Sequence, residues 1–142
     1  MMNTFSVTRT VRFSAAHRLH NPDWSDERNR AVYGRCANPG GHGHNYALRV
    51  TVTGPLDPES GMVLNVTDLR DVLRAEVVER MDHRNLNTDV PYLAGAVTTM
   101  ENIAMRIAEQ LAEPLKRMGV RLSRLELAES DRNSVTLEFK DS

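Results

Sequence analysis

Two stretches of the chain show the alternation of apolar and polar residues that is typical of half-buried β-strands. In residues 5–17 the odd positions are mostly apolar, and in residues 46–52 the even positions are apolar. Successive side chains of a strand point to opposite faces, so each pattern predicts a strand with one face in the core. We expect these strands to end near residue 17 and to run from about 42 to 53. Residues 18–41 are rich in Asn, Asp, Pro and Gly and predict a long connecting loop.

Two later segments have the spacing of amphipathic helices. Residues 67–81 carry apolar side chains at helical intervals, and Thr67 is the expected N-cap. The second helix is predicted to open with a capping box formed by Thr98 and Glu101. Its apolar stripe covers residues 103–111, and Pro114 should kink or end the helix early.

The remaining strands are predicted from shorter patterns. A short strand is expected at residues 62–65, and a closing hairpin is expected from a strand at 120–129, a turn at 130–133 and an alternating strand at 135–139. The main elements follow the order ββααββ, which predicts an α+β fold with an antiparallel four-stranded sheet and two helices on one face. A chain of 142 residues is the size of one domain, so we expect residues 1–142 to form it.

Composition narrows the class of partner. Lys and Arg number 18 and Asp and Glu number 19, so a net charge of -1 provides no basic field for nucleic acid, and a small-molecule partner is expected. One cysteine cannot form an intramolecular disulfide, and neither a signal-peptide pattern nor an apolar run of about 20 residues is present. The expectation is a cytoplasmic protein without a membrane partner.

Three histidines occupy positions where two strands should bring them together. His42 and His44 are separated only by Gly43, so their rings share one strand face, and His17 continues the apolar odd series of the first strand. If the two strands pair antiparallel, the end of the first lies beside the start of the second. Three imidazoles with a fourth position open are typical of catalytic zinc, although they also suit other transition ions. The alternative is that these are ordinary polar residues at strand ends.

Three other places have residues of chemical interest. Cys36 lies between the histidines, as a candidate nucleophile or base. Asp82 and His83 follow the first helix, where a carboxylate could orient a proton carrier, although a polar helix terminus would also explain them. Glu129 shares the apolar face of its strand, so its carboxylate must be paired, protonated or available to a ligand unless it lies at the solvent margin.

Seven segments, in order along nearly the whole chain, resemble the 6-pyruvoyltetrahydropterin synthase and 6-carboxytetrahydropterin synthase family. They are FSAAHRLH, GRCANPGGHGHNY, GMVLNVTDL, MDHRNLN, VPYLAG, TTMENIA and AESDRN. The resemblance implies the tunnelling fold, or T-fold, in which subunits join their sheets into a barrel. It also implies a homohexamer of two stacked trimers, active sites where subunits meet, and a pterin substrate.

The resemblance assigns roles to nine residues. The implied zinc ligands are His17, His42 and His44. The implied catalytic group is Cys36, Asp82 and His83. The implied substrate-binding group is Glu129, which anchors the pterin ring, with Thr99 and Glu101 at the border of the pocket. Met100 departs from the Thr or Ser-like residue expected between the last two.

The implied activity is a zinc-dependent conversion of 7,8-dihydroneopterin triphosphate to 6-pyruvoyltetrahydropterin, with elimination of triphosphate. This would make the protein a carbon-oxygen lyase of tetrahydrobiopterin biosynthesis. The alternative within the family is 6-carboxytetrahydropterin synthase, a carbon-carbon lyase of queuosine biosynthesis that releases acetaldehyde. The five residues between Cys36 and His42 favour the pyruvoyl enzyme. A third branch, which cleaves the side chain of dihydroneopterin, is disfavoured because it has glutamate at the position of Cys36.

Two other functional classes remain as alternatives. A pterin-binding protein without catalysis would need no activated base, yet Cys36, Asp82 and His83 are all present. A zinc hydrolase would need a carboxylate placed to activate water, and Glu129 already has a ligand-anchoring interpretation. Both alternatives are therefore less well supported than a pterin lyase.

Overall fold

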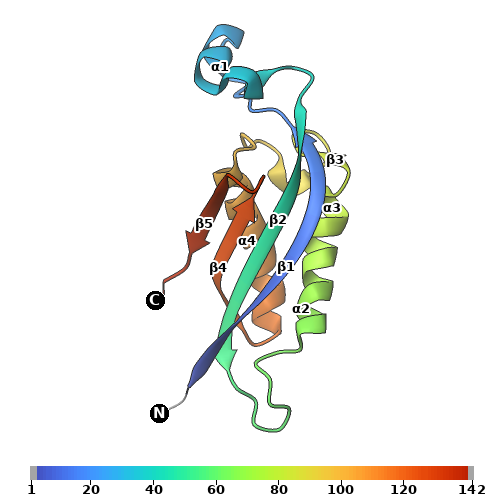
Figure 1. The fold of residues 1–142 in the computed structure, drawn as a ribbon, viewed down its shortest axis with the longest axis vertical. Helices are drawn as coiled ribbons and strands as arrows, with labels where there is room; N and C mark the ends of the chain where they lie inside the picture. Colours follow the sequence, from blue (N-terminus) through green and yellow to red (C-terminus); the bar gives the residue numbers. More distant parts are fainter. Residues whose placement is uncertain (1–2, 141–142) are drawn as a thin grey trace.

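A long antiparallel hairpin forms the centre of the sheet. In the computed structural model, which describes residues 3–140, β1 (Thr4–His17) pairs with β2 (His42–Pro55) along its whole length (Figure 1). The register sets His17 opposite His42 and Ala15 opposite His44. The alternation of apolar residues therefore predicted both strands and their pairing correctly.

Within residues 3–140 the sheet contains five strands and is mixed, so the expected four-stranded antiparallel sheet was wrong in this respect. The order is β3-β1-β2-β4-β5, with β4 at Arg121–Ala128 and β5 at Ser134–Glu138. The additional strand, β3 (Arg84–Asn85), runs parallel to β1. Two residues are too few to show an alternating pattern, which is why the sequence did not reveal it. Residues 62–65 form no strand, and only an isolated bridge joins Asp57 to Met62.

The first predicted helix is present but is built from three consecutive segments. These are α2 (Val66–Leu73), a π-helical stretch (Arg74–Val78) and α3 (Glu79–Met81). Its N-cap is Asn65, whose side chain accepts a hydrogen bond from the Thr67 backbone, so the predicted cap at Thr67 was displaced by two residues. A short 3₁₀ turn, Pro91–Leu93, follows β3.

The second predicted helix, α4 (Met100–Arg117), differs from expectation at both ends. Thr99 is the N-cap and accepts a hydrogen bond from the Asn102 backbone, so the expected capping box of Thr98 and Glu101 does not form. Pro114 lies inside the helix and does not end it. The buried neighbours Leu111 and Leu115 hold this last turn in the core on either side of the proline.

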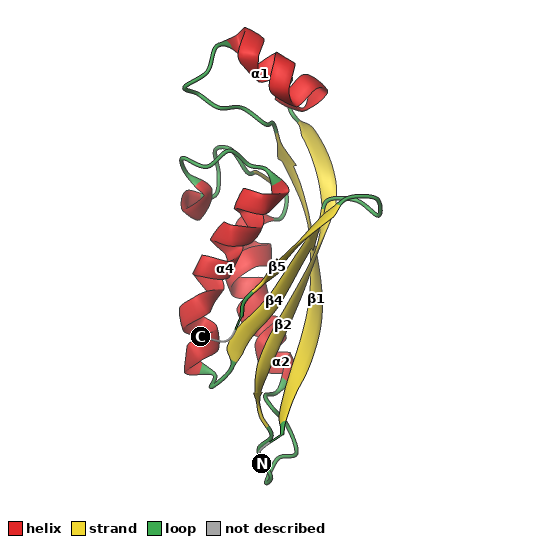
Figure 2. Ribbon diagram, turned by 90° about the vertical axis from the view of Figure 1, so that its left-hand side faces the viewer, coloured by secondary structure: helices red, strands yellow, loops and turns green. Residues whose placement is uncertain are grey.

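Both helices pack on the same face of the sheet, as predicted (Figure 2). The core joins the inward strand residues to the helix stripes; its fully buried members include Leu48, Val50, Leu73, Ile107, Leu111 and Leu125. In the described part of the chain, the opposite face of the sheet bears no helix (Figure 2) and is polar. There the hydroxyl groups of Ser6 and Thr53 lie 2.9 Å apart, and those of Thr8 and Thr51 lie 2.7 Å apart.

The long connection after β1 is partly helical. It contains α1 (Asp26–Tyr33) and a 3₁₀ turn (Gly34–Ala37), and α1 projects beyond the end of the sheet (Figure 1). In α1 only Asn29 is buried, so no apolar stripe marks the helix in the sequence. Across residues 3–140, no helix is long and apolar enough to cross a membrane.

We expect the Leu111→Ala substitution to lower the free energy of unfolding by about 2–5 kcal/mol, because it leaves a cavity where α4 meets the sheet. Met105, on the same helix, is 51% exposed, so Met105→Ala should change the stability by less than about 0.5 kcal/mol. Urea denaturation followed by circular dichroism measures both values. Equal effects of the two substitutions would contradict the assigned orientation of α4.

Candidate metal-binding active site

The three histidines converge at the end of the hairpin, as the strand pattern predicted. One ligand nitrogen from each of His17, His42 and His44 lies within 4.8 Å of the others. The ring centroids are 4.7 Å apart for His17 and His42, and 4.8 Å apart for His42 and His44. His17 is 2% exposed and the other two are half-buried. The register of β1 and β2 alone is sufficient to explain this convergence.

The protonation of His17 and His42 is suited to metal binding. The His17 Nδ1 atom lies 2.9 Å from the backbone oxygen of Thr98. Since a carbonyl can only accept, Nδ1 carries the proton and Nε2 keeps its lone pair for a ligand. Burial, and next the neighbouring His42, lower the pKa of His17 to about 4, while burial followed by His44 lowers the pKa of His42. Neutral imidazole is the form that binds a metal ion, so this donor set matches one.

We expect the metal-free protein to lose stability as the pH falls from about 6.5 toward 4. In that interval His17 takes up a proton in the unfolded chain, where its pKa is 6.5, but not in the folded chain, where its pKa is about 4. The unfolded state therefore binds more protons, and the free energy of unfolding falls by on the order of 3 kcal/mol. Urea denaturation at pH 7 and pH 4, compared with a His17→Gln variant, measures the contribution. The same pH dependence in both proteins would contradict it.

Glu129 lies beside the histidines, immediately after β4. Its Oε2 atom is 3.6 Å from the Nε2 atom of His44, and both side chains are about one-fifth exposed. The interpretation of Glu129 as a residue on the inner strand face is consistent with this position.

Tyr46 continues the strand face of His44, and its hydroxyl lies 3.5 Å from the Nε2 atom of His17. Burial and then Glu129 raise the pKa of Tyr46. Tyr46 was missed as a site residue because its position was equally consistent with a core role.

Asp82 and His83 form the oriented pair expected from the sequence, on the outer edge of β1. The His83 Nδ1–H donates to Asp82 Oδ2 at 2.9 Å, and the Ser14 N–H donates to Asp82 Oδ1 at 2.8 Å. The His83 N–H in turn donates to the Ser14 oxygen at 2.6 Å. The Ser14 N–H, and next His83, lower the pKa of Asp82, so its carboxylate is ionised at neutral pH. The parallel pairing of β3 with β1 begins at the next residues, with Arg84 opposite Ala15, and holds the Asp82–His83 pair at the edge of β1.

The backbone of His83 has an unusual conformation, with a φ of 60°. This left-handed region is uncommon for residues other than glycine, and such residues cluster at functional sites. The conformation turns the chain from α3 into β3, and it leaves the His83 side chain 84% exposed.

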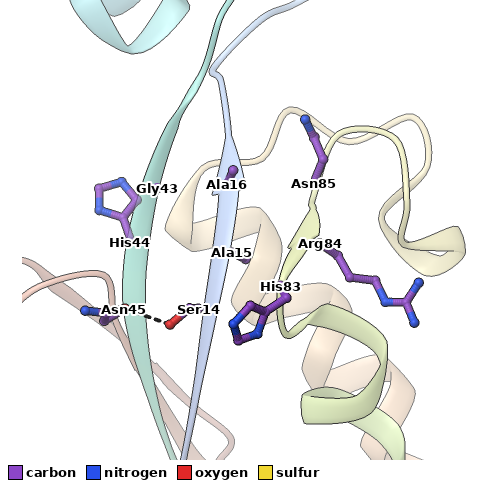
Figure 3. Close-up of a pocket in the computed structure, with 9 residues that line it drawn as sticks. All are labelled: Ser14, Ala15, Ala16, Gly43, His44, Asn45, His83, Arg84 and Asn85. Atoms are coloured by element: carbon purple, nitrogen blue, oxygen red, sulfur yellow. Dashed lines mark hydrogen bonds between the residues drawn. The ribbon is translucent and has the colours of Figure 1, made fainter.

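An open pocket of about 490 Å³ lies over the paired strands and includes His44 and His83 in its lining, but not His17, His42 or Asp82. Its walls are residues 14–16 of β1, 43–45 of β2 and 83–85. Figure 3 shows His44 and His83 on opposite sides of the paired strands. Within residues 3–140, no hydrogen bond joins His83 to the three histidines.

Cys36 lies in the 3₁₀ turn that follows α1, and its side chain is half-buried. Its backbone oxygen accepts a hydrogen bond of 2.7 Å from the Leu19 N–H, two residues beyond His17. The turn is thereby tied to the segment that directly follows His17 at the end of β1. Thr99 and Glu101 have less distinctive positions: Thr99 caps α4, and Glu101 is exposed on its first turn.

Comparisons with known proteins identify relatives of this chain. The 6-pyruvoyl tetrahydrobiopterin synthase of Poecilia reticulata is 50% identical over 109 residues, which are 77% of this chain and 74% of the relative. The enzyme of that name from Homo sapiens is 45% identical over 129 residues, 91% of this chain and 88% of the relative. The structure of Caenorhabditis elegans 6-pyruvoyl tetrahydropterin synthase superposes with a TM-score of 0.90 and 36% identity, over 98% of both chains.

A 6-carboxy-5,6,7,8-tetrahydropterin synthase of Haemophilus influenzae is more distant, at 29% identity over 82 residues, 56% of this chain and 50% of the relative. The family model described as 6-pyruvoyl tetrahydropterin synthase matches residues 6–140. The chain therefore belongs to the 6-pyruvoyl tetrahydropterin synthase family.

Proposed function

We propose that the protein is a 6-pyruvoyltetrahydropterin synthase, which converts 7,8-dihydroneopterin triphosphate to 6-pyruvoyltetrahydropterin and triphosphate. The observation that carries the proposal is the convergence of three histidines, in a chain whose human relative of that name is 45% identical. The reaction is a carbon-oxygen lyase reaction with an internal rearrangement, so it needs no external oxidant or reductant.

We infer that the metal is zinc and that His17, His42 and His44 hold it. A bound zinc ion would act as a Lewis acid on the side-chain oxygens of the substrate and would orient that side chain. The chain supplies three imidazole donors and excludes solvent from the inner ligand, since His17 is almost fully buried.

Glu129 is the proposed anchor of the pterin ring. A carboxylate accepts two parallel hydrogen bonds from adjacent N–H groups, such as those of the pterin amino and amide groups. Because Glu129 lies 3.6 Å from His44, a ring held there would direct its side chain toward the metal ligands. Thr99 and Glu101 are the proposed border of this pocket.

Cys36 and the Asp82–His83 pair are the proposed proton carriers. The Cys36 thiolate would remove a proton from a side-chain carbon next to oxygen. The hydrogen bond to Asp82 keeps the proton of His83 on Nδ1, which leaves Nε2 able to accept a proton and return it.

We also propose that the active protein is a homohexamer of two stacked trimers, with active sites where subunits meet. Three features are consistent with this assembly: the helix-free face of the sheet, the exposed His83 side chain, and the outer edge of β1, which β3 covers only at residues 15 and 16. An exposed strand edge readily pairs with another chain. A cytoplasmic location is proposed from the single cysteine.

The decisive experiment is to incubate the zinc-loaded protein with 7,8-dihydroneopterin triphosphate and to identify the products by mass spectrometry. Triphosphate and 6-pyruvoyltetrahydropterin are expected. Acetaldehyde together with 6-carboxytetrahydropterin would instead assign the protein to the related lyase. Binding of the substrate without conversion would overturn both activities.

A further inference from the structure

A buried hydrogen-bond network lies behind the innermost metal ligand. Besides the backbone oxygen of Thr98, the His17 Nδ1 atom faces the Thr98 hydroxyl at 3.2 Å. Thr98 is 0% exposed and His17 is 2% exposed, so water does not compete for these bonds. Thr98 belongs to the turn before α4, and 81 positions in the sequence separate it from His17.

Asn87 connects this threonine to the end of β1. Its side-chain oxygen accepts from the Arg18 N–H at 2.8 Å, and its amide nitrogen donates to the Arg18 oxygen at 2.9 Å. The same amide nitrogen lies 3.4 Å from the Thr98 hydroxyl, which itself donates to the Arg18 oxygen at 3.2 Å. Arg18 directly follows His17 in the chain, so the network holds the backbone next to the ligand.

The donors and acceptors of this network balance. The Thr98 hydroxyl has one proton, which it gives to Arg18, so it can only accept from Asn87 and His17. The two protons on the Asn87 amide serve Arg18 and Thr98. The Thr98 backbone oxygen and hydroxyl can therefore only accept from the His17 Nδ1 atom, so Nδ1 carries the proton. This tautomer leaves Nε2 free to bind a metal ion.

We propose that Thr98 and Asn87 are positioning residues of the metal centre, which hold the His17 ring in the tautomer and orientation that bind the ion. The inference rests on the proposed metal site but assigns to it two residues outside the ligand set. Groups that bond the second nitrogen of a metal-binding histidine fix the orientation of its ring, and their loss typically costs about 10–100-fold in metal affinity.

The test compares zinc affinity among four variants, by competition with a chromophoric chelator. Thr98→Val and Asn87→Ala should each weaken Zn²⁺ binding by about 10-fold, the lower end of the usual range, because the Thr98 backbone oxygen still accepts from the His17 Nδ1 atom in both. Thr98→Ser restores the hydroxyl and should restore the affinity. Asn102→Ala is the matched control, because the Asn102 amide holds the same turn through a 2.9 Å bond to the Val97 oxygen but bonds neither Arg18 nor His17. Its affinity should equal that of the unaltered protein.

Cobalt substitution supplies a readout that a loss of stability alone would not change. The visible absorption bands of bound Co²⁺ should shift in Thr98→Val and return in Thr98→Ser. Unchanged Zn²⁺ affinity and unchanged Co²⁺ spectra in both Thr98→Val and Asn87→Ala would overturn the positioning role while leaving the metal site intact. Failure of the unaltered protein to bind Zn²⁺ would instead overturn the metal site itself. If Asn87→Ala does not fold, the Thr98→Val and Thr98→Ser pair decides the question.

Discussion

The His42→Ala substitution is expected to abolish most zinc binding and to lower turnover by roughly a thousandfold or more. A metal ion acting as a Lewis acid contributes several kcal/mol of transition-state stabilisation, and each 1.36 kcal/mol corresponds to about tenfold in rate. His42 is the best ligand to replace, because it is half-buried and lies at the first residue of β2. His17, by contrast, is buried and hydrogen bonded to Thr98, so its loss would also disturb the fold.

His20 offers a matched control for His42. It is also a half-buried histidine, it lies three residues beyond the end of β1, and it is not a member of the metal-binding group. His20→Ala should therefore keep the zinc content and the turnover of the unaltered protein. Metal analysis and a steady-state assay measure both variants. If His42→Ala kept its zinc, the assignment of the three ligands would be wrong.

The Cys36→Ala substitution is expected to lower turnover by about 10²–10⁴-fold while zinc and pterin still bind. This is the usual contribution of a general acid or base, and alanine has no group that can exchange a proton. The fold of the turn should persist, because the bond from Leu19 goes to the backbone oxygen of Cys36, which the substitution retains. Rate measurement at saturating substrate separates the loss of turnover from a loss of binding.

The chain contains one cysteine, so no second cysteine can be replaced as a matched control. The control is therefore ligand binding, measured on the Cys36→Ala variant itself. Its zinc affinity should match that of the unaltered protein, and its complex with a non-reacting pterin should form with similar affinity. Full activity would refute the role of a base. A large loss of zinc would show that the thiol is a ligand instead.

Patterns with many repeats in the sequence predicted the fold best. The alternation in β1 and β2 covers several residues on each strand, so it identified the strands, their buried faces and the convergence of His17, His42 and His44. The helical stripes likewise identified both helices that cover the sheet. Register follows from such patterns because a slip of one residue would expose a whole buried face.

Elements that depend on few residues or on distant contacts could not be predicted in this way. The strand β3 has two residues, and α1 buries only one side chain, so neither leaves a periodic signal. The effect of Pro114 was mispredicted because packing of the flanking leucines, which the local sequence does not reveal, holds the helix together.

In the candidate site, too, local features could be predicted from the sequence and distant contacts could not. Adjacency in the chain was enough to predict the hydrogen bond between Asp82 and His83. Their attachment to β1 depends on Ser14, 68 positions away from Asp82, and no local pattern indicates it. The role inferred for Thr98 was hidden for a similar reason, because its partners come from two other parts of the chain, residues 17–18 and Asn87.

The π-helical stretch Arg74–Val78 has a consequence for where the helix ends. Steps of four residues drift around a regular α-helix, because one turn contains 3.6 residues. A wider turn absorbs part of this drift, so four residues spaced by four can all face the sheet: Leu69, Leu73, Val77 and Met81, each 0% exposed. Deleting one residue from the wide turn should therefore leave the carboxylate that follows Met81 near its strand edge, whereas deleting one residue from the regular turns before it would rotate that carboxylate by about 100° around the helix axis.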